Sequence, residues 1–123
     1  FDADNDGRQD MFVTRDANKP LFLHNQTPKV GAWLGINVQG TTTNRDGRGS
    51  LVSVTSVEGE EPQLAHVGTT GSYLTHDGRM THFGLGKLDK NIYEVKVTFP
   101  VSGKEVVLNN VKPQQVINVV EPE

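Results

Sequence analysis

Apolar and polar residues alternate along most of this chain with a period of two, which is the period of a half-buried β-strand. The clearest case is residues 93–99, in which every second residue from Tyr93 to Phe99 is apolar and the residues between them are polar. We therefore expect these apolar side chains to share one buried face. Residues 33–39 repeat the pattern. Seven shorter stretches are also predicted as strands: residues 11–15, 21–24, 51–57, 63–67, 81–85, 104–108 and 115–120.

Segments rich in Gly, Asn, Asp and Pro separate the predicted strands, and such residues favour turns. Asp77-Gly78 and Ser102-Gly103 each lie between two strand-like stretches, where they suit tight hairpins. Residues 16–20 and Asn109-Asn110 are also predicted turns. No stretch of ten residues has the period of a helix. Many short strands at this spacing predict an all-β fold, either an antiparallel β-sandwich or a barrel-like sandwich.

A short polar segment that contains Pro28 separates two unlike parts of the chain and predicts a domain boundary. Residues 1–27 hold an acidic loop and one predicted hairpin, and residues 28–123 hold the β-rich body. Two strands alone cannot bury a core. The hairpin is therefore expected to pack on the body, on another chain or on parts of a longer protein, of which we interpret this chain as a fragment.

The composition of the 123 residues narrows the classes of function. The chain has no cysteine, which excludes a disulfide scaffold, a catalytic thiol and a cysteine zinc site. Its net charge of −3 lies in residues 1–10, which carry four acidic residues and one basic residue, whereas the other residues hold 11 of each kind. We therefore expect no nucleic-acid surface. We also expect no membrane insertion, because no apolar run approaches the roughly 18 residues of a membrane span.

The acidic residues at the start of the chain have the spacing of a metal-binding loop. Positions 1, 3, 5 and 9 of this loop are all aspartate, namely Asp2, Asp4, Asp6 and Asp10. Gly7 at position 6 permits a sharp turn of the backbone. Four carboxylates this close repel one another unless a cation neutralises them, and ligands that offer only oxygen favour a hard ion. The spacing therefore predicts a Ca²⁺ site.

The loop departs from the EF-hand pattern at its end. An EF-hand needs a bidentate Glu at position 12, where this chain has Val13 within a predicted strand. We therefore expect Asp10 to close the coordination and the backbone carbonyl of Arg8, at position 7, to act as a ligand. The alternative is a solvated acidic turn that holds no ion.

Residues 2–13 resemble the acidic-loop signature of FG-GAP and VCBS repeats, the calcium-loop blades of integrin-type β-propellers; they read DADNDGRQDMFV. The following LFLHN at residues 21–25 is similar to the strand that often comes after this loop. The resemblance implies that the N-terminal part is the calcium-loop hairpin of a truncated propeller blade.

The rest of the chain resembles the ASPIC/UnbV domain, which follows such propellers in the cartilage acidic protein family. The resemblance rests on six segments in this order: WLGI at 33–36, TNRDGRGS at 43–50, GTTGSYL at 68–74, HFGLG at 82–86, VKVTFPVSG at 95–103 and NVVE at 118–121. Two details differ, since Phe99 stands where the family usually has Trp and Val101 is inserted after Pro100.

The two resemblances together imply a secreted or cell-surface protein that is not an enzyme. They point to a calcium-associated module for binding or adhesion, with a protein or a glycan as its partner on the extracellular side. Two alternatives stay open, which are a carbohydrate-binding accessory domain and a hydrolase domain.

The loop at residues 44–49 combines two cations with two glycines. Arg45 and Arg48 could together bind an anionic ligand. We favour a plain turn, in which the glycines supply a positive φ and Asp46 caps its own backbone, because turn chemistry alone accounts for these residues.

Trp33 and Tyr73 offer a platform on which a sugar could stack, although the place of Trp33 at the start of an amphipathic strand fits a core residue equally well. Asn25 begins a glycosylation sequon, which has meaning only in a secreting eukaryote.

Three histidines and an aspartate form a loose set of candidates for zinc binding or acid–base catalysis: His66, His76, His82 and Asp77. Their spacing matches no pair on one helix or strand face, so we favour structural roles. His82 is expected to point outward beside the buried Phe83 and Leu85.

Overall fold

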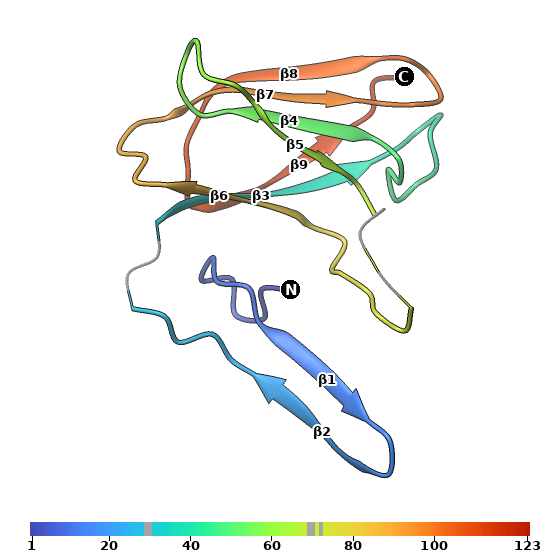
Figure 1. Ribbon diagram of the computed structural model, residues 1–123. Helices are drawn as coiled ribbons and strands as arrows, with labels where there is room; N and C mark the ends of the chain where they lie inside the picture. The colour runs from blue at the N-terminus through green and yellow to red at the C-terminus, as the bar shows by residue number, and fades with distance from the viewer. Residues whose placement is uncertain (29–30, 69–70, 72) are drawn as a thin grey trace. The chain divides into compact units, whose positions relative to one another are not determined.

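The computed structural model describes residues 1–28, 31–68, 71 and 73–123. The chain divides into two compact units, Phe1–Val30 and Gly31–Glu123 (Figure 1). Lys29, which belongs to the predicted boundary segment, and Thr69, Thr70 and Ser72, which belong to the GTTGSYL segment, lie outside the described residues. The described residues contain no helix long and apolar enough to cross a membrane.

The first unit is a loop followed by the antiparallel hairpin of β1 (Met11–Arg15) and β2 (Asn18–Leu23). Strand β2 begins earlier than predicted, because residues 18–20 continue the strand. Pro20 is tolerated there, since the outer edge of a two-stranded sheet does not need its N–H. The turn is reduced to Asp16 and Ala17, and Ala17 takes the left-handed conformation with φ of 54°.

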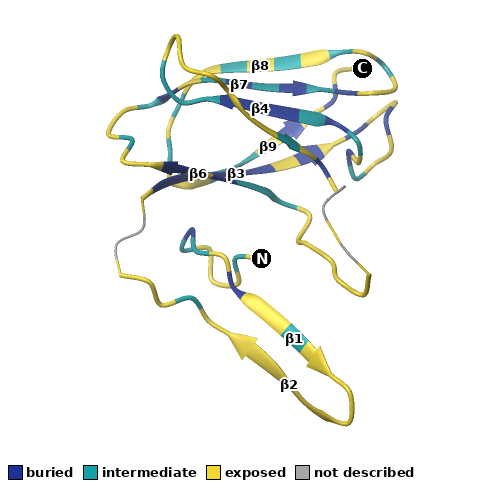
Figure 2. Cartoon of the chain, viewed as in Figure 1, coloured by how far each residue is buried: buried dark blue, intermediate teal, exposed yellow. Residues whose placement is uncertain are grey.

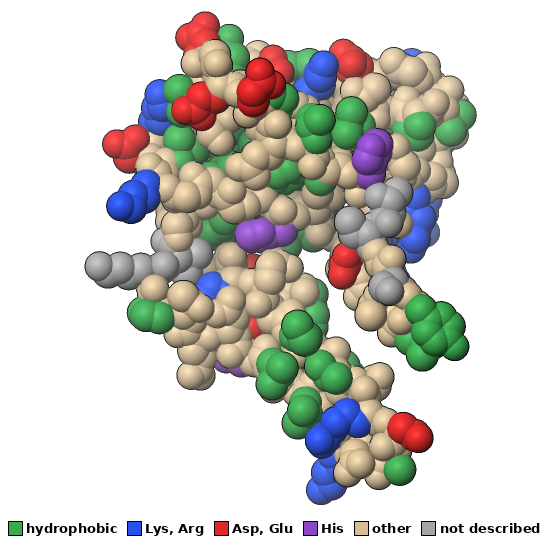
Figure 3. Space-filling model, in the orientation of Figure 1, with side chains coloured by type: hydrophobic (Ala, Val, Ile, Leu, Met, Phe, Trp, Pro, Cys, Tyr) green, Lys and Arg blue, Asp and Glu red, His purple; other side chains and the backbone are tan. Residues whose placement is uncertain are grey.

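The hairpin is exposed along most of both strands (Figure 2), and apolar side chains gather on the side of it that Figure 3 shows. The register places Met11 opposite Leu23 and Phe12 opposite Phe22, so neighbouring pairs point to opposite faces. All four of these side chains are at least half exposed, from 50% for Phe22 to 57% for Met11. The first unit therefore presents apolar surface on both sides of a two-stranded sheet.

The second unit is a sandwich of two β-sheets (Figure 1). One sheet has three strands in the order β6-β3-β9, with β3 (Ala32–Gln39), β6 (Thr81–Gly86) and β9 (Gln115–Val120). The other sheet has four strands in the order β5-β4-β7-β8, with β4 (Leu51–Thr55), β5 (Gln63–His66), β7 (Ile92–Thr98) and β8 (Glu105–Val111). Each of the nine predicted strands occurs, and the predicted all-β sandwich is confirmed.

The core of the second unit lies between the two sheets, as the buried residues in Figure 2 show. Strand β3 contributes Leu34 and Ile36 from one face, and β7 contributes Val95 and Val97 from the facing sheet; all four are 0% exposed. Phe99 is also 0% exposed, so its phenyl ring fills part of the core. Alternation of side chains along the strands accounts for this arrangement.

One strand pair departs from the antiparallel pattern. β9 runs parallel to β3, from the pair Leu34–Gln115 to the pair Gln39–Val120. The backbone N–H of Gln114 donates to the carbonyl of Trp33 at 2.7 Å, which brings the chain from β8 in the other sheet alongside the start of β3. The sandwich thus contains one parallel pair, which strand periodicity does not reveal.

The prediction for Tyr93 was wrong. Its side chain is 45% exposed, and its neighbour Ile92 is fully buried in its place. Burial alternates regularly along β7 only from Val95 onward, because Ile92 and Val95, three residues apart, are both buried. Asn109-Asn110, which was predicted as a turn, is part of β8, and Asn110 has a left-handed φ of 58° there.

One of the two predicted hairpin turns is confirmed. Gly103 has φ of 70°, and the N–H of Phe99 donates to the carbonyl of Lys104 at 2.9 Å, which closes the hairpin between β7 and β8. Asp77-Gly78 does not form a tight hairpin, because the strands on either side of it, β5 and β6, belong to different sheets.

Candidate metal centre

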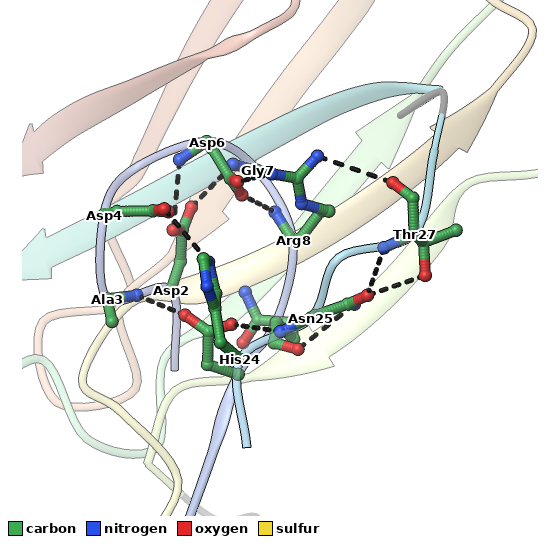
Figure 4. A network of polar contacts seen from close by, with 11 residues as sticks. Asp2, Ala3, Asp4, Asp6, Gly7, Arg8, His24, Asn25 and Thr27 are labelled. Atoms are coloured by element: carbon green, nitrogen blue, oxygen red, sulfur yellow. Dashed lines mark hydrogen bonds and ion pairs between the residues drawn. The ribbon is translucent and has the colours of Figure 1, made fainter. Parts of the chain in front are cut away.

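The acidic loop at the start of the chain closes into a ring (Figure 4). The N–H of Asp10 donates to the carbonyl of Phe1 at 2.7 Å, and the amino terminus donates to the carbonyl of Asp10 at 3.2 Å. Because Asp10 directly precedes β1, the ring is fixed to the base of the hairpin.

Asp10 is the buried carboxylate of the ring, with 7% exposure. It accepts hydrogen bonds from the backbone N–H of Asn25 at 2.8 Å and from that of Ala3 at 3.0 Å. The bond from Asn25, and then the bond from Ala3, lower the pKa of Asp10 against the opposing effect of burial. Asp10 therefore joins three segments of the first unit as an ionised carboxylate.

Two further carboxylates organise the backbone of the loop. Asp2 accepts the N–H of Asp6 at 3.1 Å and that of Gly7 at 2.8 Å. Asp6 accepts the N–H of Arg8 at 2.8 Å, and it also pairs with the Arg8 guanidinium. Gly7 has φ of 88°, a conformation that side chains rarely adopt, so the glycine is required at this turn.

Asp4 lies where the acidic side chains meet. Its carboxylate, that of Asp2 and that of Asp10 each offer an oxygen, and these atoms lie within 4.8 Å of one another. Asp4 and Asp6 form a second such group with the ring of His24, whose Nε2 lies 3.2 Å from Asp4 Oδ2. The loop therefore brings the four predicted aspartates into two overlapping groups with Asp4 in common.

This donor set fits a hard divalent cation, since carboxylate oxygens predominate. Arg8 was predicted as a ligand through its carbonyl. Its N–H and guanidinium both bind Asp6, and Nη1 donates to the carbonyl of Thr27 at 3.4 Å. A cation that takes Asp6 competes with this guanidinium.

Residue spacing does not reveal that His24 is a neighbour of the acidic residues. The hairpin register is the signal that finds it, because pairing of Met11 with Leu23 places the residues after β2 beside those before β1. Asn25, the sequon residue, lies in the same place, and its side chain accepts from the backbone N–H of Thr27 at 3.1 Å and from its hydroxyl at 2.6 Å.

Arg45 and Arg48 of the 44–49 loop line different clefts. The side chain of Asn44 accepts the N–H of Arg48 and donates to the carbonyl of Arg48, both at 2.9 Å. Asn44 therefore caps the turn, and Asp46 instead pairs with Arg79. Arg45 lies apart in a polar groove with Asn37, Gln39 and Asn118.

The remaining candidate residues lie in separate places. Trp33 is 7% exposed and stacks on His82, with ring centroids 5.8 Å apart, whereas Tyr73 is 88% exposed. Trp33 faces away from the main core, because it alternates with the core residue Leu34. His66 is an exposed residue of β5. His76 and Asp77 line one cleft, together with residues 46, 48, 67, 68, 71, 75, 78 and 79.

Near the end of the second unit, Glu121 has a buried carboxylate that residue spacing does not reveal. Glu121 is 1% exposed. Its Oε2 accepts three consecutive backbone N–H groups, those of Thr41 at 2.7 Å, Thr42 at 2.8 Å and Thr43 at 2.7 Å. Its Oε1 accepts the hydroxyl of Thr43 at 2.9 Å and that of Ser102 at 2.5 Å. We call this group the Glu121 latch.

The hydrogen bonds of the latch keep Glu121 ionised. Burial alone would raise the pKa of this carboxyl, but the bonds from Ser102, Thr41 and Thr43 outweigh burial and lower it from 4.5 to about 2. The buried charge is thus satisfied by donors and needs no cationic partner.

A sequence model of the family described as ASPIC and UnbV matches residues 40–123. The chain belongs to the ASPIC and UnbV family. No curated protein and no solved structure matches the chain. The residues that match ASPIC and UnbV contain all parts of the Glu121 latch, and they exclude the acidic loop. The TNRDGRGS segment of this ASPIC and UnbV chain therefore serves at least one structural purpose, because its first residue, Thr43, binds Glu121.

Proposed function

We propose that this chain is a non-enzymatic, calcium-associated binding or adhesion module that acts on the extracellular side, secreted or at the cell surface. One observation carries the proposal: Asp2, Asp4 and Asp10 bring carboxylate oxygens within 4.8 Å of one another. Like charges at such distances destabilise the loop unless a cation offsets them. In this proposal Ca²⁺ rigidifies the loop, and the second unit presents its surface to a protein or glycan partner.

We also propose that the first unit is the hairpin of a propeller blade of FG-GAP or VCBS type, within a larger protein. Its apolar side chains support this proposal, since they point to both faces of a two-stranded sheet. A strand pair of this kind suits a position between neighbouring layers of structure. A hairpin with only one face in water would instead alternate apolar residues on its covered face with polar residues on its exposed face.

Asp4 is the residue best suited to test the calcium site. Asp2, Asp6 and Asp10 each accept backbone N–H groups, so their replacement disturbs the loop itself. The Asp4 carboxylate pairs with His24, accepts none of the backbone hydrogen bonds described above, and belongs to a side chain that is 49% exposed. Asp4→Asn therefore removes a charge from both carboxylate groups and leaves the backbone bonds of the loop in place.

The experiment is a calorimetric titration of Ca²⁺ into the wild type, Asp4→Asn and the control Asp16→Asn, which neutralises an exposed aspartate in the hairpin turn. We expect wild type and control to bind with a dissociation constant of about 10⁻⁴ to 10⁻³ M, the range of extracellular calcium modules. Asp4→Asn is expected to lose the binding heat. Equal heats for Asp4→Asn and the wild type, or no heat for the wild type, would contradict the proposal.

A further inference from the structure

A cleft of about 400 Å³ lies at one end of the four-stranded sheet. None of its lining residues belongs to the 44–49 loop or to the acidic loop. The turn after β4, the start of β7 and the end of β8 form its walls. Its volume lies within the range of small-molecule sites, roughly 300–1,000 Å³. The lining residues are Ser56, Val57, Glu58, Lys90, Asn91, Tyr93, Asn109 and Asn110.

Tyr93 lines this cleft from the start of β7 and is 45% exposed. Asn110, which has a left-handed φ of 58°, lines the cleft from the end of β8. The backbone N–H of Tyr93 donates to the carbonyl of Ser56 at 3.2 Å, which joins the start of β7 to the segment after β4. The backbone of Tyr93 is therefore held in place, and its side chain is partly exposed.

The phenol hydroxyl of Tyr93 lies 3.4 Å from Glu58 Oε1. The negative charge of Glu58 raises the pKa of Tyr93, with a smaller effect from burial, so the phenol keeps its proton. The cleft thus has a carboxylate that accepts hydrogen bonds beside a hydroxyl that both donates and accepts.

Three amide side chains face the same space. Asn91 donates through Nδ2 to Asn110 Oδ1 at 3.0 Å, which leaves the oxygen of Asn91 and the amino group of Asn110 for other partners. The side chain of Asn109 has no hydrogen-bond partner within the described residues. Lys90 and Glu58 carry opposite charges, so the lining as a whole is neutral.

We propose that this cleft binds a neutral pyranose sugar, as the terminal or exposed residue of a glycan. The open face of Tyr93 suits the C–H face of a sugar ring, and aromatic side chains with a polar tip are suited to such partly wet sites. Amides and a carboxylate provide both donors and acceptors for vicinal hydroxyls. The neutral lining favours uncharged sugars over phosphate or acidic sugars, which need a surplus of cationic groups.

The polar groove near Arg45 is a weaker candidate for the same ligand. Its amides bond one another, since Asn37 donates to Asn118 at 3.2 Å, and its Asp46 pairs with Arg79. That groove also has no aromatic residue in its lining. The Tyr93 cleft also holds a bonded pair of amides, and its aromatic residue is what distinguishes it from the groove.

This inference rests on the proposed role of the second unit as a binding module, and it does not rest on the calcium site. The test is an NMR titration of the full chain with cellobiose, maltose, mannobiose and lactose, each up to about 10 mM, the weak end of specific binding. Digalacturonate and inorganic phosphate serve as charged probes. We expect at least one neutral disaccharide to shift the amide resonances of residues 56–58, 90–93 and 109–110.

Variants then tie the binding to the cleft. Tyr93→Ala is expected to weaken sugar binding at least about tenfold. Asn109→Ala is expected to weaken it severalfold. The matched control is Tyr73→Ala, which removes the other tyrosine of the chain at a site outside the cleft. Folding of each variant is checked by the dispersion of its NMR spectrum. If Tyr93→Ala disturbs β7, Asn109→Ala still tests whether the sugar binds in this cleft.

Repeating the titration with EDTA separates this inference from the calcium proposal. Sugar binding without Ca²⁺ is expected, and failure of the calorimetric test leaves it unchanged. The inference is overturned by the absence of shifts with all four neutral sugars, by shifts that stay equal in Tyr93→Ala and Asn109→Ala, or by tighter binding of the charged probes.

Discussion

Replacement of Thr43 by Val tests the Glu121 latch, because the two side chains have nearly the same shape and differ by one hydroxyl. Thr43 is 2% exposed, and its hydroxyl donates to Glu121 Oε1 at 2.9 Å. The variant keeps the backbone bond from Thr43 to Oε2, and Ser102 continues to donate to Oε1. One hydrogen bond to a buried charge is therefore removed, with little change in packing volume.

A hydrogen bond to a charged group contributes about 1.5–3 kcal/mol to stability, so we expect Thr43→Val to lower the free energy of unfolding by that amount. With a urea m-value of roughly 1–3 kcal/mol per molar, this loss corresponds to a midpoint shift on the order of 1 M. The control is Thr41→Val, at an exposed residue whose hydroxyl makes only long contacts of 3.4 Å with Glu121. Its effect is expected within about 0.5 kcal/mol, as for most surface changes.

The assay is urea unfolding followed by the fluorescence of Trp33, which is the single tryptophan of the chain and lies in β3 of the second unit. Equal midpoints for Thr43→Val and the wild type would refute the argument that the latch stabilises this unit. A loss in Thr41→Val as large as that in Thr43→Val would refute the assignment of the effect to the buried bond.

The latch also predicts how stability depends on pH. The pKa of Glu121 is about 2 in the folded chain and 4.5 in its ordinary range, so between these values the unfolded chain binds more protons. The contribution of Glu121 is fully present above about pH 4.5 and is lost as the pH falls toward 2. The difference between wild type and Thr43→Val is therefore expected to shrink across this window. A difference that stays constant from pH 5 to pH 2 would contradict it.

Two further variants test the packing of the sandwich by the same unfolding assay. Gly47→Ala is expected to cost more than about 1 kcal/mol, because Gly47 has φ of +62° and a Cβ there would lie 2.6 Å from Val38 Cγ1. Gly59→Ala, at φ of +83° with nothing within 4 Å of the added atom, measures the backbone strain alone, and equal losses in the two variants would exclude the contact with Val38. Leu34→Ala, at a fully buried position, is expected to cost about 2–5 kcal/mol. Val107→Ala, at a 45% exposed position, is its control, and a loss as large as that of Leu34→Ala would contradict the placement of the core.

Short apolar stretches between turn residues were sufficient to predict all nine strands. The strands of the second unit enclose a core, whereas β1 and β2 carry exposed apolar residues on both faces. Alternation does not report which sheet a strand joins. The parallel pairing of β9 with β3 and the separation of β5 from β6 depend on contacts between distant segments. The prediction for Tyr93 failed because burial alternates regularly along β7 only from Val95 onward, and Ile92 is the residue buried at the start of the strand.

Some residues of the candidate sites were likewise predictable from local sequence, and others were not. Spacing alone brought Asp2, Asp4 and Asp10 together, since all three belong to one short loop. His24 and Glu121 were not predictable from spacing. His24 reaches the loop through the register of the hairpin, and Glu121 reaches Thr43 across 78 residues through the pairing of β9 with β3.

The pairing of β9 with β3 has a consequence for the order in which the protein is made. Strand β3 is synthesised first within the second unit, but its parallel neighbour and the carboxylate of Glu121 follow about 80 residues later. The ribosome therefore exposes the apolar face of β3 long before the strand that completes its sheet. Long-range pairing of this kind slows folding and leaves partly folded chains prone to association. The second unit is thus expected to complete its fold only after residue 121 has left the ribosome.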